Sequence, residues 1–219
     1  MALGKDEIAR LYRKRARHYD FSANLYYLLG FREFAYRKKA VRALGLKRGD
    51  VVVEIGCGTG LNFRFLRQAV GSEGRIIGVD LTSEMLEEAA KRVAENHWSN
   101  VELVKSDAAM FQFPQPVDGV LSTFAITLMP EYDRIIQKGA AALRAGKKLV
   151  VLDFKKPDAW PRWLINLFVW ITKPFGVSID LTERHPWDSI HRHLSHVQWQ
   201  ELYFGSVYIC VGEAPERAM

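Results

Sequence analysis

The stretch that most constrains the fold is Val51–Gly60, which reads Val-Val-Val-Glu-Ile-Gly-Cys-Gly-Thr-Gly. Its near-continuous apolar run is typical of a strand buried on both faces of a parallel sheet. Gly56, Gly58 and Gly60 follow at alternate positions, and glycine allows the backbone conformations with which a turn approaches a ligand closely. Asn62 can cap a following helix. The pattern therefore predicts a strand, a ligand-binding turn and a helix whose N-terminus faces that turn.

A second strand supports a nucleotide-type ligand. Residues 75–80 read Arg-Ile-Ile-Gly-Val-Asp and end in an acid 24 residues after Gly56. An acid at this place in a nucleotide-binding βαβ unit can accept hydrogen bonds from ribose hydroxyls. The glycine spacing is Gly-x-Gly-x-Gly because position 61 is Leu, so it differs from the Gly-x-Gly-x-x-Gly of dehydrogenases.

Beyond the glycine turn, strand patterns alternate with helix patterns, which predicts an α/β fold with a doubly wound, mostly parallel sheet. A helix over about 33–44 precedes the first strand, and Pro130 can open a helix that runs to about Leu143. Gly205 separates two last strand patterns, which predict an antiparallel hairpin. The strands expected after the first one are residues 75–79, 101–104, 118–123, 148–154, 198–204 and 206–211.

A chain of 219 residues with 48% hydrophobic and 26% charged residues fits one globular domain. We therefore expect a single domain over residues 1–219. Its predicted parts are a basic helical cover at 1–48, a cofactor-binding core at 49–155, an aromatic insert at 156–197 and a terminal hairpin at 198–212.

Positive charge and aromatic side chains are unevenly distributed. Residues 1–48 carry 13 Lys or Arg against four acids, and residues 5–19 have the pattern of a basic amphipathic helix. Such a helix can bind an anionic membrane surface, but the charge also fits nucleic acid or a solvated face. Residues 160–177 are too short to span a bilayer and too apolar to face only water. With no signal-peptide pattern, we expect a cytoplasmic, peripherally membrane-associated protein.

The motifs around the predicted pocket resemble those of class I S-adenosylmethionine-dependent methyltransferases over about residues 48–155, with a Rossmann-like sheet. This resemblance implies that the glycine turn receives the methionine end of S-adenosylmethionine and that Asp80 binds the ribose diol. It further implies that Asp107 binds the adenine amino group, between Leu81 and Ala108. The candidate cofactor-binding residues are Tyr19, Glu54, Gly56, Cys57, Gly58, Gly60, Asp80, Leu81, Asp107, Ala108 and Thr123.

Several acceptors and a metal are not expected. The place after the fourth strand reads Ser-Thr-Phe-Ala, without the Asn/Asp-Pro-Pro-aromatic motif of adenine N6 methyltransferases. Neither Cys57 nor Cys210 lies where cytosine C5 methyltransferases carry a nucleophile. Histidines near the C-terminus lack the accompanying cysteines or carboxylates of a metal site. Sequence alone identifies no catalytic residue.

The flanking segments suggest the acceptor. Tyr19-Asp20, the aromatic run 26–30, the loop 128–130 and the insert resemble bacterial phospholipid and betaine-lipid N-methyltransferases. Tyr19-Asp20 also resembles a segment of ubiquinone and menaquinone methyltransferases. The first resemblance implies N-methylation of a lipid amine headgroup (phosphatidylethanolamine or diacylglyceryl-homoserine type) at an anionic membrane surface. The alternative is C-methylation of a prenylated quinone precursor. A nucleic-acid-binding protein and a non-catalytic cofactor-binding module are further alternatives, although we expect no nucleic-acid partner.

Overall fold

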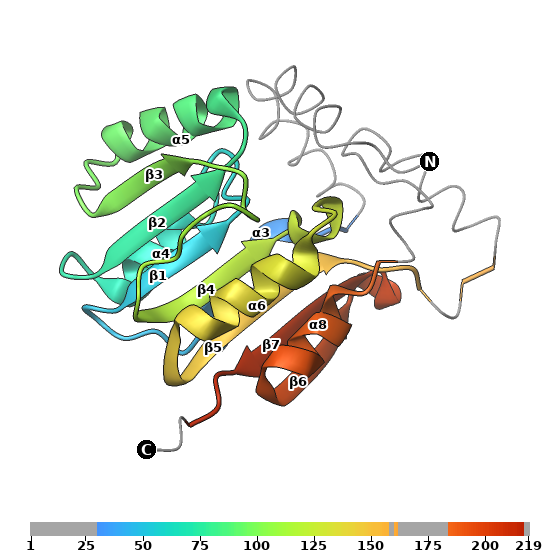
Figure 1. Cartoon of the computed structure of the whole chain (residues 1–219). Helices are drawn as coiled ribbons and strands as arrows, with labels where there is room; N and C mark the ends of the chain where they lie inside the picture. The colour runs from blue at the N-terminus through green and yellow to red at the C-terminus, as the bar shows by residue number, and fades with distance from the viewer. Residues whose placement is uncertain (1–29, 158–159, 162–183, 217–219) are drawn as a thin grey trace.

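The computed structural model describes residues 30–157, 160–161 and 184–216. The predicted basic helix over residues 5–19 lies outside these residues, and so does most of the aromatic segment 160–177. Figure 1 shows the described part as one open sheet with helices packed on it. Within that part, no helix is both long enough and apolar enough to cross a bilayer.

The sheet has seven strands in the order β3-β2-β1-β4-β5-β7-β6. The strands from β3 to β5 pair in parallel, whereas β7 runs antiparallel to both β5 and β6. This topology confirms the predicted doubly wound, mostly parallel sheet with an antiparallel end. The strands are β1 (Val51–Ile55), β2 (Arg75–Asp80), β3 (Val101–Lys105), β4 (Val117–Thr123), β5 (Leu143–Phe154), β6 (Ser195–Leu202) and β7 (Val207–Glu213).

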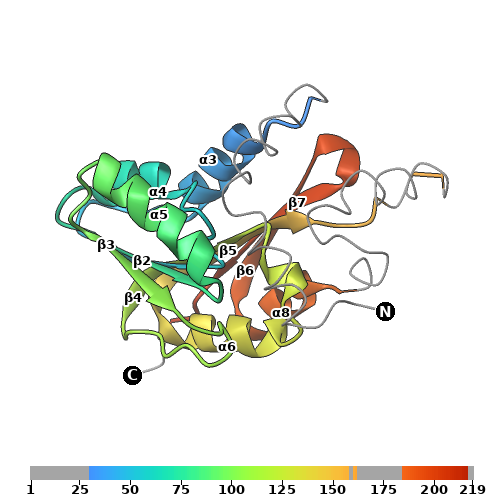
Figure 2. The same cartoon turned by 90° about the horizontal axis from the view of Figure 1, so that it is seen from above.

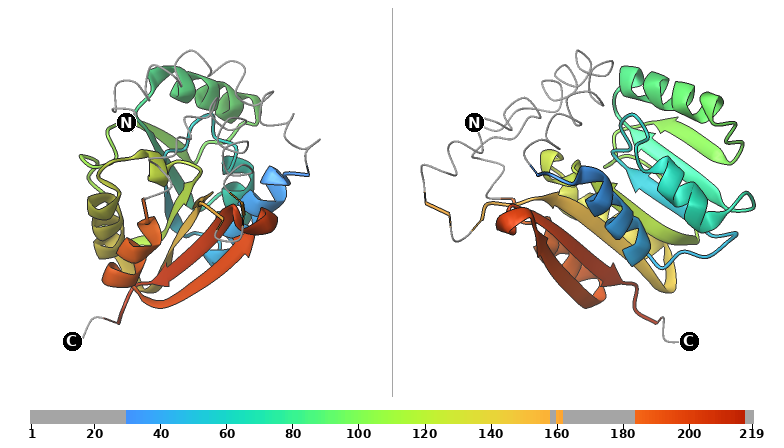
Figure 3. Two further views of the ribbon diagram at one scale, coloured as in Figure 1. Left: turned by 90° about the vertical axis from the view of Figure 1, so that its right-hand side faces the viewer. Right: turned by 180° about the vertical axis from the view of Figure 1, so that it is seen from behind.

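Helices cover both faces of the sheet, as Figures 2 and 3 show. One face carries α3 (Glu33–Ala43), α4 (Phe63–Val70) and α5 (Ser83–Glu95). The other face carries α6 (Tyr132–Ala142) and α8 (Pro186–His193). Two short 3-10 turns complete the described elements: η3 (Ile126–Leu128) follows β4, and η6 (Tyr203–Gly205) joins β6 to β7.

The sheet separates two apolar cores, because successive side chains of a strand point to opposite faces. Val52 of β1 belongs to the core that contains Phe63 and Leu66 of α4. The next residue, Val53, belongs to the opposite core, together with Ile135 of α6. Because both faces of the first strand are buried, it needs apolar residues at consecutive positions, and this requirement explains the apolar run that begins at Val51.

Several elements differ from the sequence predictions, among them β6, which begins at Ser195, three residues before the predicted start at 198. Strand β5 begins at Leu143, five residues before the predicted start at 148, because Val117 pairs with Leu143 ahead of an irregularity in the register. The helix expected to open at Pro130 begins at Tyr132. Helix α8 was not predicted. It begins at Pro186, and proline suits the first turn of a helix. The rest of the helix is rich in polar residues and histidines, so the sequence around Ile190 shows no clear apolar periodicity.

Candidate functional site

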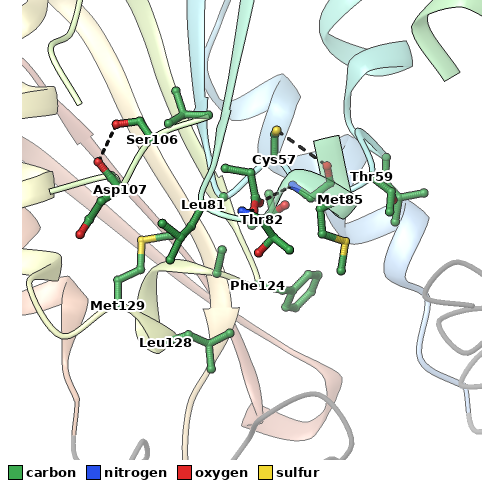
Figure 4. Close-up of a pocket in the computed structure, with 18 of the residues that line it drawn as sticks. Cys57, Thr59, Leu81, Thr82, Met85, Ser106, Asp107, Phe124, Leu128 and Met129 are labelled. Atoms are coloured by element: carbon green, nitrogen blue, oxygen red, sulfur yellow. Dashed lines mark hydrogen bonds between the residues drawn. The ribbon is translucent and has the colours of Figure 1, made fainter. Parts of the chain in front are cut away.

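A pocket lies at the carboxyl ends of β1, β2, β3 and β4 (Figure 4). In a doubly wound sheet this is the edge at which ligands bind, because the loops that follow neighbouring parallel strands meet there. The pocket wall comes from four of these loops and from two helices. Its lining includes residues within 56–61, 79–82, 106–108, 123–125 and 128–131, together with Arg37 of α3 and Met85 of α5.

The three glycines of the turn after β1 have positive φ angles but face different surroundings. A Cβ atom on Gly56 would lie 2.4 Å from the Cβ of Ala125, so this residue lets the turn pack against the loop after β4. A Cβ atom on Gly60 would lie 2.5 Å from the ring of Phe63, so the absence of a side chain at Gly60 lets the turn pack closely against α4. A Cβ atom on Gly58, whose φ is 53°, would meet nothing within 4 Å. Gly58 therefore gives the pocket an open backbone surface.

Asp80 ends β2 and holds the glycine turn in place. Its Oδ2 accepts a hydrogen bond from the N–H of Gly58 at 2.9 Å, and its Oδ1 accepts one from the N–H of Thr82 at 2.9 Å. Burial raises the pKa of the carboxyl, while the two backbone donors oppose that shift. Each carboxylate oxygen has a second lone pair, so Asp80 can also accept hydrogen bonds from a ligand in the pocket.

The end of the pocket beside β3 can hold a flat ring. Leu81 is 40% exposed and lines the wall, and Ala108 adds apolar surface to it. Asp107 lies beside them, with its Oδ1 held by the backbone N–H of Ala109 at 2.9 Å. Figure 4 shows Leu81, Met129 and Asp107 at this side of the pocket. Apolar walls with one carboxylate at the rim suit a planar base that carries an amino group.

A buried polar pair lies beneath the glycine turn. Glu54 is 1% exposed, and its Oε1 accepts a hydrogen bond from Nδ2 of Asn62. The same nitrogen donates to Oγ1 of Thr123 at 2.8 Å. Asn62 is the N-cap residue of α4, as predicted, but its side chain makes no hydrogen bond to the helix, because the amide bonds to Glu54 and Thr123 instead. Burial raises the pKa of Glu54 to about 7.

Arg37 reaches the pocket from α3 and was absent from the predicted site. Its Nη1 donates to Oγ1 of Thr123, and its Nε donates to Oε1 of Glu33 at 2.7 Å. The guanidinium also lies over the ring of Phe124, 5.1 Å from the ring centre. The i to i+4 spacing from Glu33 to Arg37 indicates an ion pair. Nothing in that spacing indicates that the pair is buried beside the pocket.

Most of the predicted cofactor residues meet in this one place. Gly56, Cys57, Gly58, Asp80, Leu81, Asp107, Ala108 and Thr123 all line the pocket. Glu54 and Gly60 do not line the pocket, and Tyr19 falls outside the described residues. The lining residues that were not among the candidates are Arg37, Thr59, Leu61, Val79, Thr82, Met85, Ser106, Phe124, Ala125, Leu128, Met129, Pro130 and Glu131.

Comparison with known proteins agrees with the fold. Residues 52–146 match the family model described as a methyltransferase domain. Demethylmenaquinone methyltransferase of Listeria monocytogenes serotype 4a (strain HCC23) is 26% identical over 144 residues, which are 64% of this chain and 61% of that protein. Demethylmenaquinone methyltransferase of Lactobacillus johnsonii is 28% identical over 182 residues, 80% of this chain and 73% of that protein.

Solved structures show the same architecture. A S-adenosylmethionine-dependent methyltransferase of Aquifex aeolicus superposes with a TM-score of 0.55 at 20% identity, covering 81% of this chain and 89% of that one. Phosphoethanolamine N-methyltransferase 2 of Haemonchus contortus, solved with S-adenosylmethionine, superposes with a TM-score of 0.66 at 14% identity, covering 82% and 52%.

Sheet order, pocket position and family match agree with one another. Residues 52–146 match a methyltransferase domain, and the chain has the Rossmann-like fold of S-adenosylmethionine-dependent methyltransferases of known structure. The match to the Listeria protein spans 61% of that protein's length, so the acceptor requires its own argument.

Glu54 gives a prediction about pH and stability. Its pKa is about 7 in the folded chain against an ordinary value of 4.5, so between these values the folded protein binds more protons than the unfolded protein. The free energy of unfolding contributed by Glu54 therefore falls as pH rises through this range, by at most about 1.4 kcal/mol per pH unit. Glu54→Gln removes this titration. In urea unfolding at pH 5, 6 and 7, the stability of the variant relative to wild type should rise with pH; a constant difference would contradict the assignment.

Proposed function

We propose that the protein methylates a ring carbon of a prenylated quinone precursor, using S-adenosylmethionine as the methyl donor. The flanking sequence patterns favour N-methylation of a lipid amine, whereas the curated relatives are demethylmenaquinone methyltransferases and favour the quinone. Both acceptors are lipophilic. The observation that carries the proposal is a row of aromatic side chains that leads from the pocket to the protein surface.

This aromatic row begins at Phe124, which lines the pocket. The ring centre of Phe124 lies 4.9 Å from that of Phe154 and 5.8 Å from that of Phe31. Phe31 contacts Tyr203 at 5.2 Å, and Tyr203 contacts Phe204 at 5.5 Å. Phe204 is 80% exposed at the end of the row. A prenyl tail that follows these rings keeps its apolar surface out of water while the headgroup reaches the pocket.

A cationic lipid amine suits the same wall less well. Aromatic faces can hold a methylated ammonium through cation–π contacts. The face of Phe124, the aromatic ring of the row that lines the pocket, already carries the guanidinium of Arg37. A second cation there would be repelled by the first. The neutral ring of a quinone precursor meets no such repulsion.

The residues of the pocket fit S-adenosylmethionine in extended form, and we assign them accordingly. Asp107, Leu81 and Ala108 hold the adenine, Asp80 accepts hydrogen bonds from the ribose hydroxyls, and the open backbone at Gly58 receives the methionine end. These assignments follow the order of the strands, since the cofactor then runs from the end of β3 across β2 to β1. The open space at Gly58 supports them.

Bound S-adenosylmethionine supplies an electrophilic methyl group on a positively charged sulfur. The protein aligns the acceptor carbon with that methyl group and excludes water from the space between them. Leu128 and Met129 contribute the apolar part of this wall. As the new carbon–carbon bond forms, the methyl–sulfur bond breaks with its electron pair on sulfur, and the ring proton passes to water. The described lining contains neither histidine nor lysine, so water is the proton acceptor we infer.

The assignment of Asp80 is testable by binding. Asp80→Ala removes the acceptor for the ribose and leaves the N–H groups of Gly58 and Thr82 without their partner. Loss of hydrogen bonds to a charged group costs about 1.5–3 kcal/mol, so calorimetry should show affinity for S-adenosylhomocysteine reduced by about tenfold or more. Asp133→Ala, which removes an exposed carboxylate that pairs with Arg192, is the control and should bind normally. Equal affinity in both variants would exclude Asp80 from the site.

The acceptor is tested with purified protein, methyl-labelled S-adenosylmethionine and mixed micelles that contain one acceptor at a time. We expect label in a demethylated, prenylated quinol and none in phosphatidylethanolamine. Label only in the lipid headgroup would overturn the quinone proposal in favour of N-methylation.

The aromatic row gives this assay a structural control. Phe204→Ser should raise KM several-fold for the long-tailed quinol and leave KM unchanged for an analogue without the tail. Met110→Ser changes another apolar side chain, which is 62% exposed and does not line the pocket, and should alter neither value. An equal rise for both acceptors in Phe204→Ser would show that the row does not contact the tail.

A prenylated acceptor lies in a membrane, so the proposal includes work at an anionic membrane surface. Helix α3 exposes Lys38, Lys39 and Arg42, and each basic residue near such a surface contributes about 1 kcal/mol of attraction. Replacing Lys38 and Lys39 by Glu should reduce co-sedimentation with anionic liposomes at low salt. The matched control replaces the exposed Lys91 and Lys105 by Glu, on α5 and β3. Equal losses in the two variants would mean that α3 does not face the membrane.

A further inference from the structure

We propose that Arg37 binds the α-carboxylate of S-adenosylmethionine, so that helix α3 anchors the methionine end of the cofactor. The inference rests on the cofactor and on the geometry of the pocket, and it does not depend on which acceptor is methylated. It gives a specific task to a residue of the segment that precedes the sheet.

The charges around the pocket single out Arg37. Among the described residues that line it, Arg37 is the one cationic side chain, whereas Asp80, Asp107 and Glu131 are acidic. S-adenosylmethionine carries one carboxylate. Removing a carboxylate from water is unfavourable unless a positive or hydrogen-bonding partner compensates it. Acidic neighbours repel it, so the carboxylate is most stable at the guanidinium.

The position of Arg37 fits the methionine end and not the adenine end. The strands that form the pocket lie in the order β3, β2, β1, β4. Asp107 follows β3 and Asp80 ends β2, which places adenine and ribose on that side of the glycine turn. Arg37 donates to Thr123, the last residue of β4, on the other side of the turn. An extended cofactor that begins at Asp107 therefore ends near Arg37.

The guanidinium is already oriented before any ligand binds. Nε and Nη2 contact Oε1 of Glu33 at 2.7 and 2.6 Å, and the plane of the guanidinium lies near the ring of Phe124. Arg37 is only 4% exposed, so little side-chain freedom remains to be lost on binding. Glu33 does not line the pocket, and a ligand there meets the cationic member of the pair. A planar guanidinium recognises a carboxylate with good geometry.

A structural ion pair is the competing explanation, because Glu33 and Arg37 also tie α3 to β4. The two explanations predict different changes in ligand affinity when the charge of Arg37 is removed. A carboxylate-binding arginine affects only ligands that possess the carboxylate. A purely structural arginine affects every ligand of a deformed pocket equally.

The test compares two ligands by calorimetry. S-adenosylhomocysteine has the amino-acid end, and 5′-deoxy-5′-methylthioadenosine lacks it. The double variant Glu33→Gln with Arg37→Met removes both charges and leaves no buried carboxylate unpaired. We expect its affinity for S-adenosylhomocysteine to fall about 10- to 100-fold, the range for hydrogen bonds to a charged group, while affinity for methylthioadenosine stays within about twofold.

Glu33→Gln alone is the matched control, since it keeps Arg37, and it should preserve the preference for S-adenosylhomocysteine. Arg37→Lys keeps the charge without the planar fork and should show a smaller loss that is still selective for S-adenosylhomocysteine. It also serves as the test variant if the double variant does not fold. Equal losses for both ligands, or no loss for either, would overturn the proposal. A wrong acceptor assignment would leave these binding results unchanged.

Discussion

The hydrogen bond from the N–H of Gly58 to Asp80 is the contact on which the pocket depends. It joins the turn after β1 to the end of β2, and two further bonds, from the N–H groups of Gly56 and Cys57 to the carbonyl of Val79, hold the same junction. A turn fixed to the neighbouring strand keeps its backbone open toward the ligand. The carboxylate that fixes the turn also lines the pocket, so one side chain both holds the turn and forms part of the pocket wall.

The glycine turn and Asp80 could be predicted from the sequence because the constraints on these residues are local. Gly56, Gly58 and Gly60 each need a positive φ, and Asp80 must follow a strand that is buried on both faces. Such requirements appear as fixed residue types at fixed spacings. The sheet order follows from the same regularity, since alternating strand and helix patterns leave few topologies open.

The rest of the site depends on contacts between residues far apart in the chain. Arg37 and Thr123 are 86 residues apart, and Asn62 and Thr123 are 61 apart. No local pattern separates an arginine that enters a pocket from the exposed basic residues beside it on α3. Asn62 shows the reverse case, since its position suits a helix cap, but a buried acid and a strand end compete successfully for its amide. Tertiary contacts therefore determine the hydrogen-bond partners of both Arg37 and Asn62.

The same contacts form a continuous buried chain from Glu33 through Arg37, Thr123 and Asn62 to Glu54. Buried ionic groups are weak evidence for stability, because replacing them by apolar side chains of similar volume is often neutral or stabilising. Such a chain is better suited to fixing geometry, because each member has few arrangements that satisfy its hydrogen bonds. It couples α3, β4 and β1 beside the pocket.

A different contact holds the loop after β4, which forms the neighbouring part of the pocket wall. Asp153, at the end of β5, is 3% exposed and accepts the N–H of Thr127 at 3.0 Å and that of Phe154 at 2.8 Å. Burial raises the pKa of Asp153 to about 6, so at neutral pH it is a charged acceptor that fixes the loop after β4. That loop carries Phe124 and Met129 into the pocket. Under the proposed function, the loops after β1 to β3 hold the cofactor, so we expect acceptor choice to depend on the loop that Asp153 holds and on the aromatic row beside it.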